Sequence, residues 1–153
     1  MTMVLDTGSD APAISARNQW GERVEPDFGG ATVLYFYPRD DTDGCTTQAR
    51  QFDDHYDTYR DAGIPVYGVS TDDVDSHRAF AEDHDLAFDL LADPDGEIAD
   101  AFDVPLDDGR AVRTTFVIAA GRVVGLYEGV RPDGHARDVL RDLAELGLVD
   151  PAE

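Results

Sequence analysis

Residues 32–37 read TVLYFY, a run in which every side chain is aliphatic, aromatic or β-branched. A strand with one wet face alternates polar and apolar residues, whereas this run has no polar face. We therefore expect both of its faces to be buried, as in the central strand of an α/β sheet. Pro38 follows directly and ends the strand, because proline has no N–H to donate to a neighbouring strand.

The remaining sequence supplies layers for both faces of that strand. The chain has 153 residues, which fits one domain with a real core. Residues 44–60 form the clearest helix, since Cys45, Ala49 and Phe52 recur at helical spacing. The other predicted elements are strands at 64–69, 88–91, 115–119 and 122–128, helices at 73–84 and 134–146, a short helix ending at 102, and two short strands around a turn at 18–21. We expect residues 1–7 and 148–153 to be flexible ends of this single domain, 1–153.

The order of these elements predicts the sheet. Alternating strands and helices favour parallel pairing first, and a closing hairpin around Ala120-Gly121 adds antiparallel strands. Thr71 or Asp72 can cap the helix at 73–84, and Asp93 precedes a proline at the start of the short helix. We predict an α/β fold with a mixed central sheet and helices on both faces, compatible with the thioredoxin-like architecture.

Charge limits the partners of the chain. It has 12 Arg, no Lys, 26 Asp and seven Glu, for a net charge of −21. A surface that neutralises phosphates is missing, which excludes a general nucleic-acid binder and disfavours anionic membranes. No apolar run exceeds five residues, and the first 12 residues have no basic or apolar leader region. We expect no nucleic acid, no membrane and a cytoplasmic protein.

The acidic residues are spread along the chain and do not form a tail. A dispersed coat of carboxylates repels itself at ordinary salt and is screened at about 1 M salt, where the Debye length is roughly 3 Å. This composition resembles that of cytosolic proteins from salt-accumulating halophiles. An acidic protein from a mesophile is the alternative.

Cys45 is the only cysteine, so neither a disulfide within the chain nor a CxxC site can form. It lies in the first turn of the predicted helix, where free backbone N–H groups stabilise a thiolate. Asp40, Asp41 and Asp43 oppose that effect. Position alone leaves two interpretations open: a reactive nucleophile, or a small apolar filler on the buried helix face.

A resemblance decides between them. Pro38, Thr42 and Cys45 match the P-x-x-x-T-x-x-C signature of peroxiredoxins. The sequence from residue 8 to 146 resembles the peroxiredoxin Q subfamily, also called bacterioferritin comigratory proteins. The matching segments are LYFYP at 34–38, GCT at 44–46, GVS at 68–70, SH at 76–77, LADPDG at 91–96 and RTTFVI at 113–118.

The resemblance implies a thiol-dependent peroxidase without a cofactor. Cys45 would be the peroxidatic cysteine, reducing hydrogen peroxide or organic hydroperoxides and becoming a sulfenic acid. Thr42 would position the peroxide, Arg113 would hold the thiolate and the leaving oxygen, and Pro38 would shield the sulfur. Backbone N–H groups of Gly44 and Cys45 would complete the substrate pocket. Taken singly, Thr42 could be a cap, Arg113 a surface cation and Pro38 a strand stop.

The sequence also departs from its relatives. Many of them carry a resolving cysteine five residues after the first, where this chain has Arg50, and Gln48 replaces a glutamate. Asp43 replaces a common proline, which bears on loop stiffness. With no resolving cysteine, we expect a one-cysteine cycle in which a low-molecular-weight thiol or a thioredoxin-like reductant restores Cys45. A monomer or weak dimer is expected, because dense negative charge disfavours association.

Other functions fit the residues less well. His77 and His84 are two helical turns apart, too far for a metal pair, and the acidic loops at Gly44 and Gly96 lack the terminal ligands of a calcium loop. We expect no metal site. A non-catalytic redox sensor or scaffold on the same fold is the alternative function, and turnover with a thiol supply separates it from an enzyme.

Overall fold

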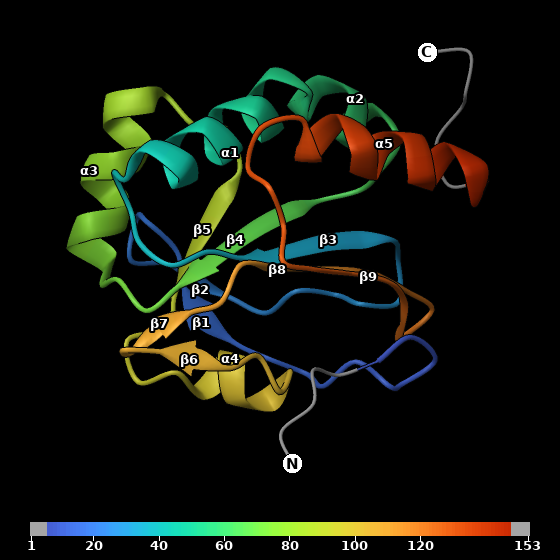
Figure 1. Ribbon diagram of the computed structural model, residues 1–153, viewed down its shortest axis with the longest axis horizontal. Coiled ribbons are helices and arrows are strands. Elements are labelled where there is room, and N and C mark those ends of the chain that lie inside the picture. Colours follow the sequence, from blue (N-terminus) through green and yellow to red (C-terminus); the bar gives the residue numbers. More distant parts are fainter. Residues whose placement is uncertain (1–5, 148–153) are drawn as a thin grey trace.

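The computed structural model describes residues 6–147. Its main sheet has the strand order β5-β4-β3-β8-β9 (Figure 1). The pairs β3–β4 and β4–β5 are parallel, and β3–β8 and β8–β9 are antiparallel, which confirms the predicted mixed sheet. These strands are β3 (Thr32–Phe36), β4 (Val66–Ser70), β5 (Asp89–Ala92), β8 (Thr114–Ala119) and β9 (Arg122–Glu128).

The apolar run identified in the sequence is the middle strand. β3 is buried at all five positions and lies between β4 and β8. Its side chains alternate between two cores. Val33, Tyr35 and the following Tyr37 join one hydrophobic cluster, whereas Leu34 and Phe36 join the other. The absence of a polar face in this segment therefore follows from its position between two packed layers.

Helices cover both faces, as predicted, but unequally. Figure 1 shows α1, α2 and α5 above the sheet, α3 at its left side near β5, and α4 below it. The upper core includes Phe52 of α1, Phe80 of α3 and Val139 of α5. The helices span α1 (Asp43–Asp54), α2 (Tyr56–Asp61), α3 (Val74–His84), α4 (Glu97–Ala101) and α5 (His135–Glu145).

The lower face is completed by short segments. Ile98 and Phe102 of the α4 region belong to the same cluster as Leu34 and Phe36 of β3, and the Phe102 ring lies 5.9 Å from that of Phe36 between centroids. The predicted turn at 18–21 does join two short strands, β1 (Ala16–Arg17) and β2 (Arg23–Val24). A second small hairpin, β6 (Leu106–Asp107) with β7 (Arg110–Ala111), was not predicted. Its two-residue strands are too short to give a period-2 signal.

The N-terminal segment reaches both outer strands of the main sheet. Near its start, Gly8 N donates to Val123 O of β9 at 2.8 Å, and Val123 N donates to Ser9 O at 2.9 Å. Further on, the side-chain amide of Gln19 bonds to the backbone beside β5: Nε2 donates to Phe88 O, and Oε1 accepts from Leu90 N. One segment thus satisfies backbone groups at two opposite edges.

Three local predictions need correction. The helix predicted at 44–60 is two helices, since the chain leaves helical geometry at His55 (φ −96°, ψ 2°). Asp73, and not Thr71 or Asp72, caps α3 by accepting from Ser76 N. Asp93 does not sit next to α4, which begins at Glu97 after a left-handed Gly96; its carboxylate instead reaches forward to the N–H groups of Ile98 and Ala99.

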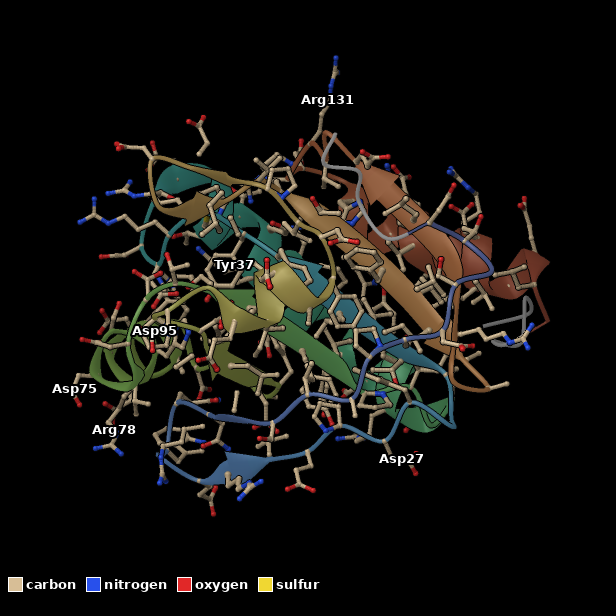
Figure 2. All side chains as sticks on the ribbon, turned by 90° about the horizontal axis from the view of Figure 1, so that it is seen from below. Asp27, Tyr37, Asp75, Arg78, Asp95 and Arg131 are labelled. Carbon is tan, nitrogen blue, oxygen red and sulfur yellow. The ribbon has the colours of Figure 1, made fainter. Side chains whose placement is uncertain are left out.

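Most charged residues lie on the outside, whereas Asp40 and Asp93 are buried. Figure 2 shows Asp27, Asp75, Asp95 and Arg131 pointing away from the molecule and Tyr37 in its interior. The predicted flexible ends 1–5 and 148–153 lie outside the described residues, and Asp6 and Thr7 are exposed. Among residues 6–147, no helix is both long enough and apolar enough to cross a membrane.

Candidate active site

Cys45 lies where the sequence predicts it, in the first turn of α1 after the loop from β3. Its side chain belongs to the upper core, and only 1% of the residue is exposed. The helix start is formed by backbone, since Thr46 N donates to Thr42 O at 2.8 Å. The free N–H groups of this first turn place partial positive charge beside the sulfur.

Arg113, which precedes β8, supplies the cation that the sequence could only suggest. Its Nη2 donates to Cys45 Sγ at 3.4 Å, and its Nη1 donates to Gln48 Oε1 at 2.5 Å. Two contacts fix both arms of the planar guanidinium. The prediction that Arg113 meets Cys45 agrees with this geometry, and the alternative of a free surface arginine does not.

Gly44 has a specific steric reason to be glycine. A Cβ added there would lie 3.2 Å from Arg113 Nη2 and 3.2 Å from Pro132 Cγ. Both distances are shorter than ordinary van der Waals contact, so any side chain would displace the guanidinium or the loop before α5. The missing side chain therefore lets Arg113 approach the first turn of α1.

Thr42 and Pro38 are placed near the site but are not joined to the sulfur by a hydrogen bond. Thr42 is the N-cap residue of α1, and its hydroxyl donates to Arg39 O at 3.1 Å. Within residues 6–147 it makes no side-chain cap bond, so it is not a helix cap of the usual kind. Pro38 is half-buried and directly follows Tyr37 at the end of β3.

Gln48 belongs to the site, although the sequence singled it out only as a departure from the family. It lies one turn after Cys45 on the same helix face, which is the signal that places it there. The residue is fully buried, and its Nε2 has no hydrogen-bond partner among the described residues. A neutral amide thus orients Arg113 without neutralising its charge.

Two buried aromatic residues adjoin the site. Burial raises the pKa of Tyr35 well above its usual value, and the nearby charges of Cys45 and Asp40 raise it further. Its ring stacks on Phe52 of α1 at 4.6 Å between centroids. His135, at the start of α5, has its pKa lowered to about 4 by burial, with a smaller contribution from the Arg113 charge. Both groups are neutral at pH 7.

A second polar cluster lies behind the loop from β3 to α1. Asp40, Asp72 and His77 each bring one oxygen or nitrogen within 4.8 Å of the others. These atoms already bond to one another and to neighbouring groups, with His77 Nδ1 2.7 Å from Asp40 Oδ2. The sequence placed His77 in a segment shared with the family and excluded it as half of a metal pair, but it gave no link to Asp40, 37 residues away.

Comparison with known proteins identifies the family of the chain. A profile of the AhpC/TSA family matches residues 7–126. The chain belongs to the AhpC/TSA family, and its enzymatic class is that of the thiol-dependent peroxidases. Within this class it is similar to peroxiredoxins named Bcp or peroxiredoxin Q. It is 34% identical to peroxiredoxin Bcp of Bacillus subtilis over 94% of this chain and 98% of that protein.

Solved structures share its fold. The crystal structure of peroxidoxin BcpB from Mycobacterium tuberculosis superposes with a TM-score of 0.85 at 30% identity, covering 93% of this chain and 98% of that one. The bacterioferritin comigratory protein of Xanthomonas campestris gives a TM-score of 0.84 at 31% identity, over 92% and 99%. These similarities confirm the predicted thioredoxin-like fold and the resemblance to the peroxiredoxin Q group.

Proposed function

We propose that Cys45 is the peroxidatic cysteine of this enzyme. Its thiolate attacks the distal oxygen of a hydroperoxide, the O–O bond breaks, and the leaving oxygen takes a proton to become water or an alcohol. The sulfur is oxidised to a sulfenic acid and the peroxide is reduced. The observation that supports this most directly is the 3.4 Å contact between Arg113 Nη2 and Cys45 Sγ.

The neighbouring residues then have distinct roles. Arg113 stabilises the thiolate and the charge that develops on the leaving oxygen. The backbone N–H groups of Gly44 and Cys45 bind peroxide, and the Thr42 hydroxyl orients it. Thr42 is suited to this because its proton is already directed to Arg39 O, which leaves its lone pairs for a peroxide O–H. Pro38 limits access of water at the end of β3.

We further propose a one-cysteine cycle. The sulfenic acid reacts with an external thiol to give a mixed disulfide and water, and a second thiol releases Cys45 and leaves as a disulfide. Arg50 stands on α1 where relatives carry a second cysteine, and the chain has no other. The reductant is a low-molecular-weight thiol or a thioredoxin-like protein.

The peroxide substrates are hydrogen peroxide and organic hydroperoxides. The Xanthomonas campestris protein, whose structure the chain shares at a TM-score of 0.84, is described by its alkyl peroxide reduction activity.

The deciding experiment mixes reduced protein with one equivalent of hydrogen peroxide in molar KCl. Stopped-flow measurement and intact mass follow the single thiol. We expect fast addition of one oxygen, none in Cys45→Ser, and slow addition in Arg113→Ala. Oxidation no faster than that of a free thiol would contradict the proposal. Turnover of many peroxides per chain with added thiol separates an enzyme from a sensor, which stops after one oxidation.

The acidic surface supports a second part of the proposal, that the protein works in the salt-rich cytoplasm of a halophile. The net charge is −21, and the labelled acidic side chains of Figure 2 point outward. Unfolding measured from low to molar KCl should show stability rising with salt. Unchanged stability would favour an acidic mesophilic protein instead. We also propose a monomer or weak dimer, which sedimentation at both salt concentrations tests.

A further inference from the structure

The loop between β3 and α1 carries Pro38 and Thr42 and leads into Cys45. In its middle, Asp40 turns inward, and only 6% of the residue is exposed. Three donors meet its carboxylate: the Tyr37 hydroxyl at 2.6 Å on Oδ1, and the Ser76 hydroxyl at 2.8 Å and His77 Nδ1 at 2.7 Å on Oδ2. Three such contacts fix the orientation of the carboxylate in the loop.

Both ring nitrogens of His77 have hydrogen-bond partners. His77 Nε2 is 3.1 Å from the carbonyl oxygen of Leu91, and a carbonyl can only accept, so Nε2 carries a hydrogen. Nδ1 faces a carboxylate that already accepts from two hydroxyls. His77 Nδ1 lies 2.7 Å from Asp40 Oδ2, so the two side chains form a buried hydrogen-bonded pair.

Tyr37 keeps its proton in this arrangement. Burial raises the pKa of Tyr37 well above its usual value, and the adjacent Asp40 charge raises it further. The hydroxyl therefore keeps its proton at neutral pH and donates it to Asp40. It connects the end of β3 to the same carboxylate that α3 binds through Ser76 and His77.

The backbone of the loop is tied as well. Asp40 N donates to Asp72 Oδ2 at 2.8 Å, and Ser70 Oγ donates to the same oxygen at 2.6 Å. The next residue, Asp41, has a left-handed backbone (φ 61°), which is unfavourable for a residue with a side chain. Its carboxylate lies 3.7 Å from His84 Nε2 near the end of α3. The loop is therefore held in an unfavourable shape by contacts to β4 and α3.

We propose that Asp40 and His77 form a latch that positions Cys45, which the proposed function makes the peroxidatic residue. The pair acts through the loop: it fixes Thr42 and the first turn of α1 against Arg113 without touching the peroxide. Breaking the pair releases the loop, so peroxide meets a misplaced thiolate. The same release uncovers the sulfur, which is 1% exposed when the latch is closed.

The test measures two reaction rates of Cys45, oxidation by peroxide and labelling by maleimide. Opening the latch should change these rates in opposite directions. The variants are Asp40→Asn, His77→Gln and the double variant. We expect oxidation by hydrogen peroxide to slow about tenfold or more, because small misplacements of reacting groups are costly. Labelling by a bulky maleimide should accelerate about tenfold. The double variant should match the single ones, since either change opens the latch.

Two control variants distinguish release of the loop from a general loss of stability. Ile98→Ala on α4 lowers stability from the opposite face of the sheet, and Glu82→Gln removes an exposed charge from α3. Neither should change the two rates below the melting temperature. If Asp40→Asn and His77→Gln lower the melting temperature as Ile98→Ala does and leave both rates at wild-type values, the latch is wrong.

A milder variant covers the case in which those variants do not fold. Tyr37→Phe removes one hydroxyl from Asp40 and should shift both rates in the same directions by a smaller factor. No shift in either rate would also overturn the proposal. The maleimide arm does not depend on peroxidase activity. Slow oxidation of the wild-type protein would contradict the proposed function, while maleimide labelling would still test the latch.

Discussion

The two faces of the central sheet differ in the polarity of what they bury. β3 supplies both: Tyr35, together with Tyr37 beyond its end, faces α1 and α3, whereas Leu34 and Phe36 face α4. The upper face holds buried polar groups beside its core, among them His77 and His135. The cluster on the lower face is built from aliphatic and aromatic side chains, and the buried carboxylate beside it, Asp93, only accepts from the first N–H groups of α4.

The difference shows how one fold separates stability from chemistry. Apolar packing stabilises the fold without directional bonds. The lower face is therefore sensitive to a loss of side-chain volume, but it holds none of the proposed reacting groups. Buried polar groups cost free energy unless they are partnered, and their partners fix their positions. On the upper face, this cost of burying polar groups is offset by the hydrogen bonds that hold Cys45 and Arg113 in place. The four predictions below test this division.

The largest effect should come from the lower face and concern stability alone. Phe102 packs on the rings of Phe36 and Phe116, at 5.9 and 5.0 Å between centroids. Phe102→Ala should lower the free energy of unfolding by about 3–5 kcal/mol through lost burial and a cavity. Denaturant unfolding measures the loss. At a temperature where the variant is folded, oxidation of Cys45 should keep its wild-type rate; a loss of rate would break the division between the faces.

The opposite result is expected on the upper face. Arg113→Ala should slow oxidation of Cys45 by about 10²–10³-fold, or roughly 2.7–4 kcal/mol of transition-state stabilisation. Stopped-flow measurement with peroxide in excess gives the rate constant. Arg110→Ala, which removes an exposed arginine three residues upstream, is the control and should have little effect. Equal losses in the two variants would indicate a general effect of positive charge.

His135 makes the upper face sensitive to pH. Burial lowers the pKa of His135 to about 4, below its unfolded value near 6.5. The stability that the protein gains by burying the neutral imidazole is therefore complete above pH 6.5 and is lost as pH falls toward 4. His135→Gln removes this loss. Between pH 7 and 4.5, the wild type should lose about 2 kcal/mol more stability than the variant. Parallel pH curves of unfolding free energy would show that His135 does not titrate there.

The smallest effect tests the approach of Arg113 to the helix. Gly44→Ala places a Cβ 3.2 Å from both Arg113 and Pro132, and a shift of a few tenths of an ångström should slow Cys45 oxidation about tenfold. Gly30→Ala is the matched control, because a Cβ there meets nothing within 4 Å. An unchanged rate in Gly44→Ala would mean that the guanidinium has room to move.

Much of the fold could be predicted from local pattern. The run at 32–37 identified the central strand, and the hairpin turn was recognised because Ala120-Gly121 follows one β run and precedes another. Both turn residues have positive φ (54° and 74°), as such tight turns require. The break at His55 was missed, because Tyr56 and Tyr59 continue the same apolar spacing across it.

The site was predicted in part. Cys45 and Arg113 carry a family signature, so the resemblance could join residues 68 positions apart. The partnership of Asp40 with His77 had no such signal, because neither an acidic loop residue nor a helical histidine shows which residue it faces. The acids around Cys45 were read as opposing the thiolate. Asp40 in fact turns inward and forms a hydrogen-bonded pair with His77.

The N-terminal segment has a consequence for self-association. Outer strands offer unpaired backbone groups to a second chain, which is a common route to sheet extension and aggregation. Here residues Gly8 and Ser9 occupy the start of β9, and the Gln19 amide imitates a neighbouring strand beside β5. The segment thus covers part of both edge strands of the sheet. A chain that lacked it would expose those backbone groups to a second copy of the protein.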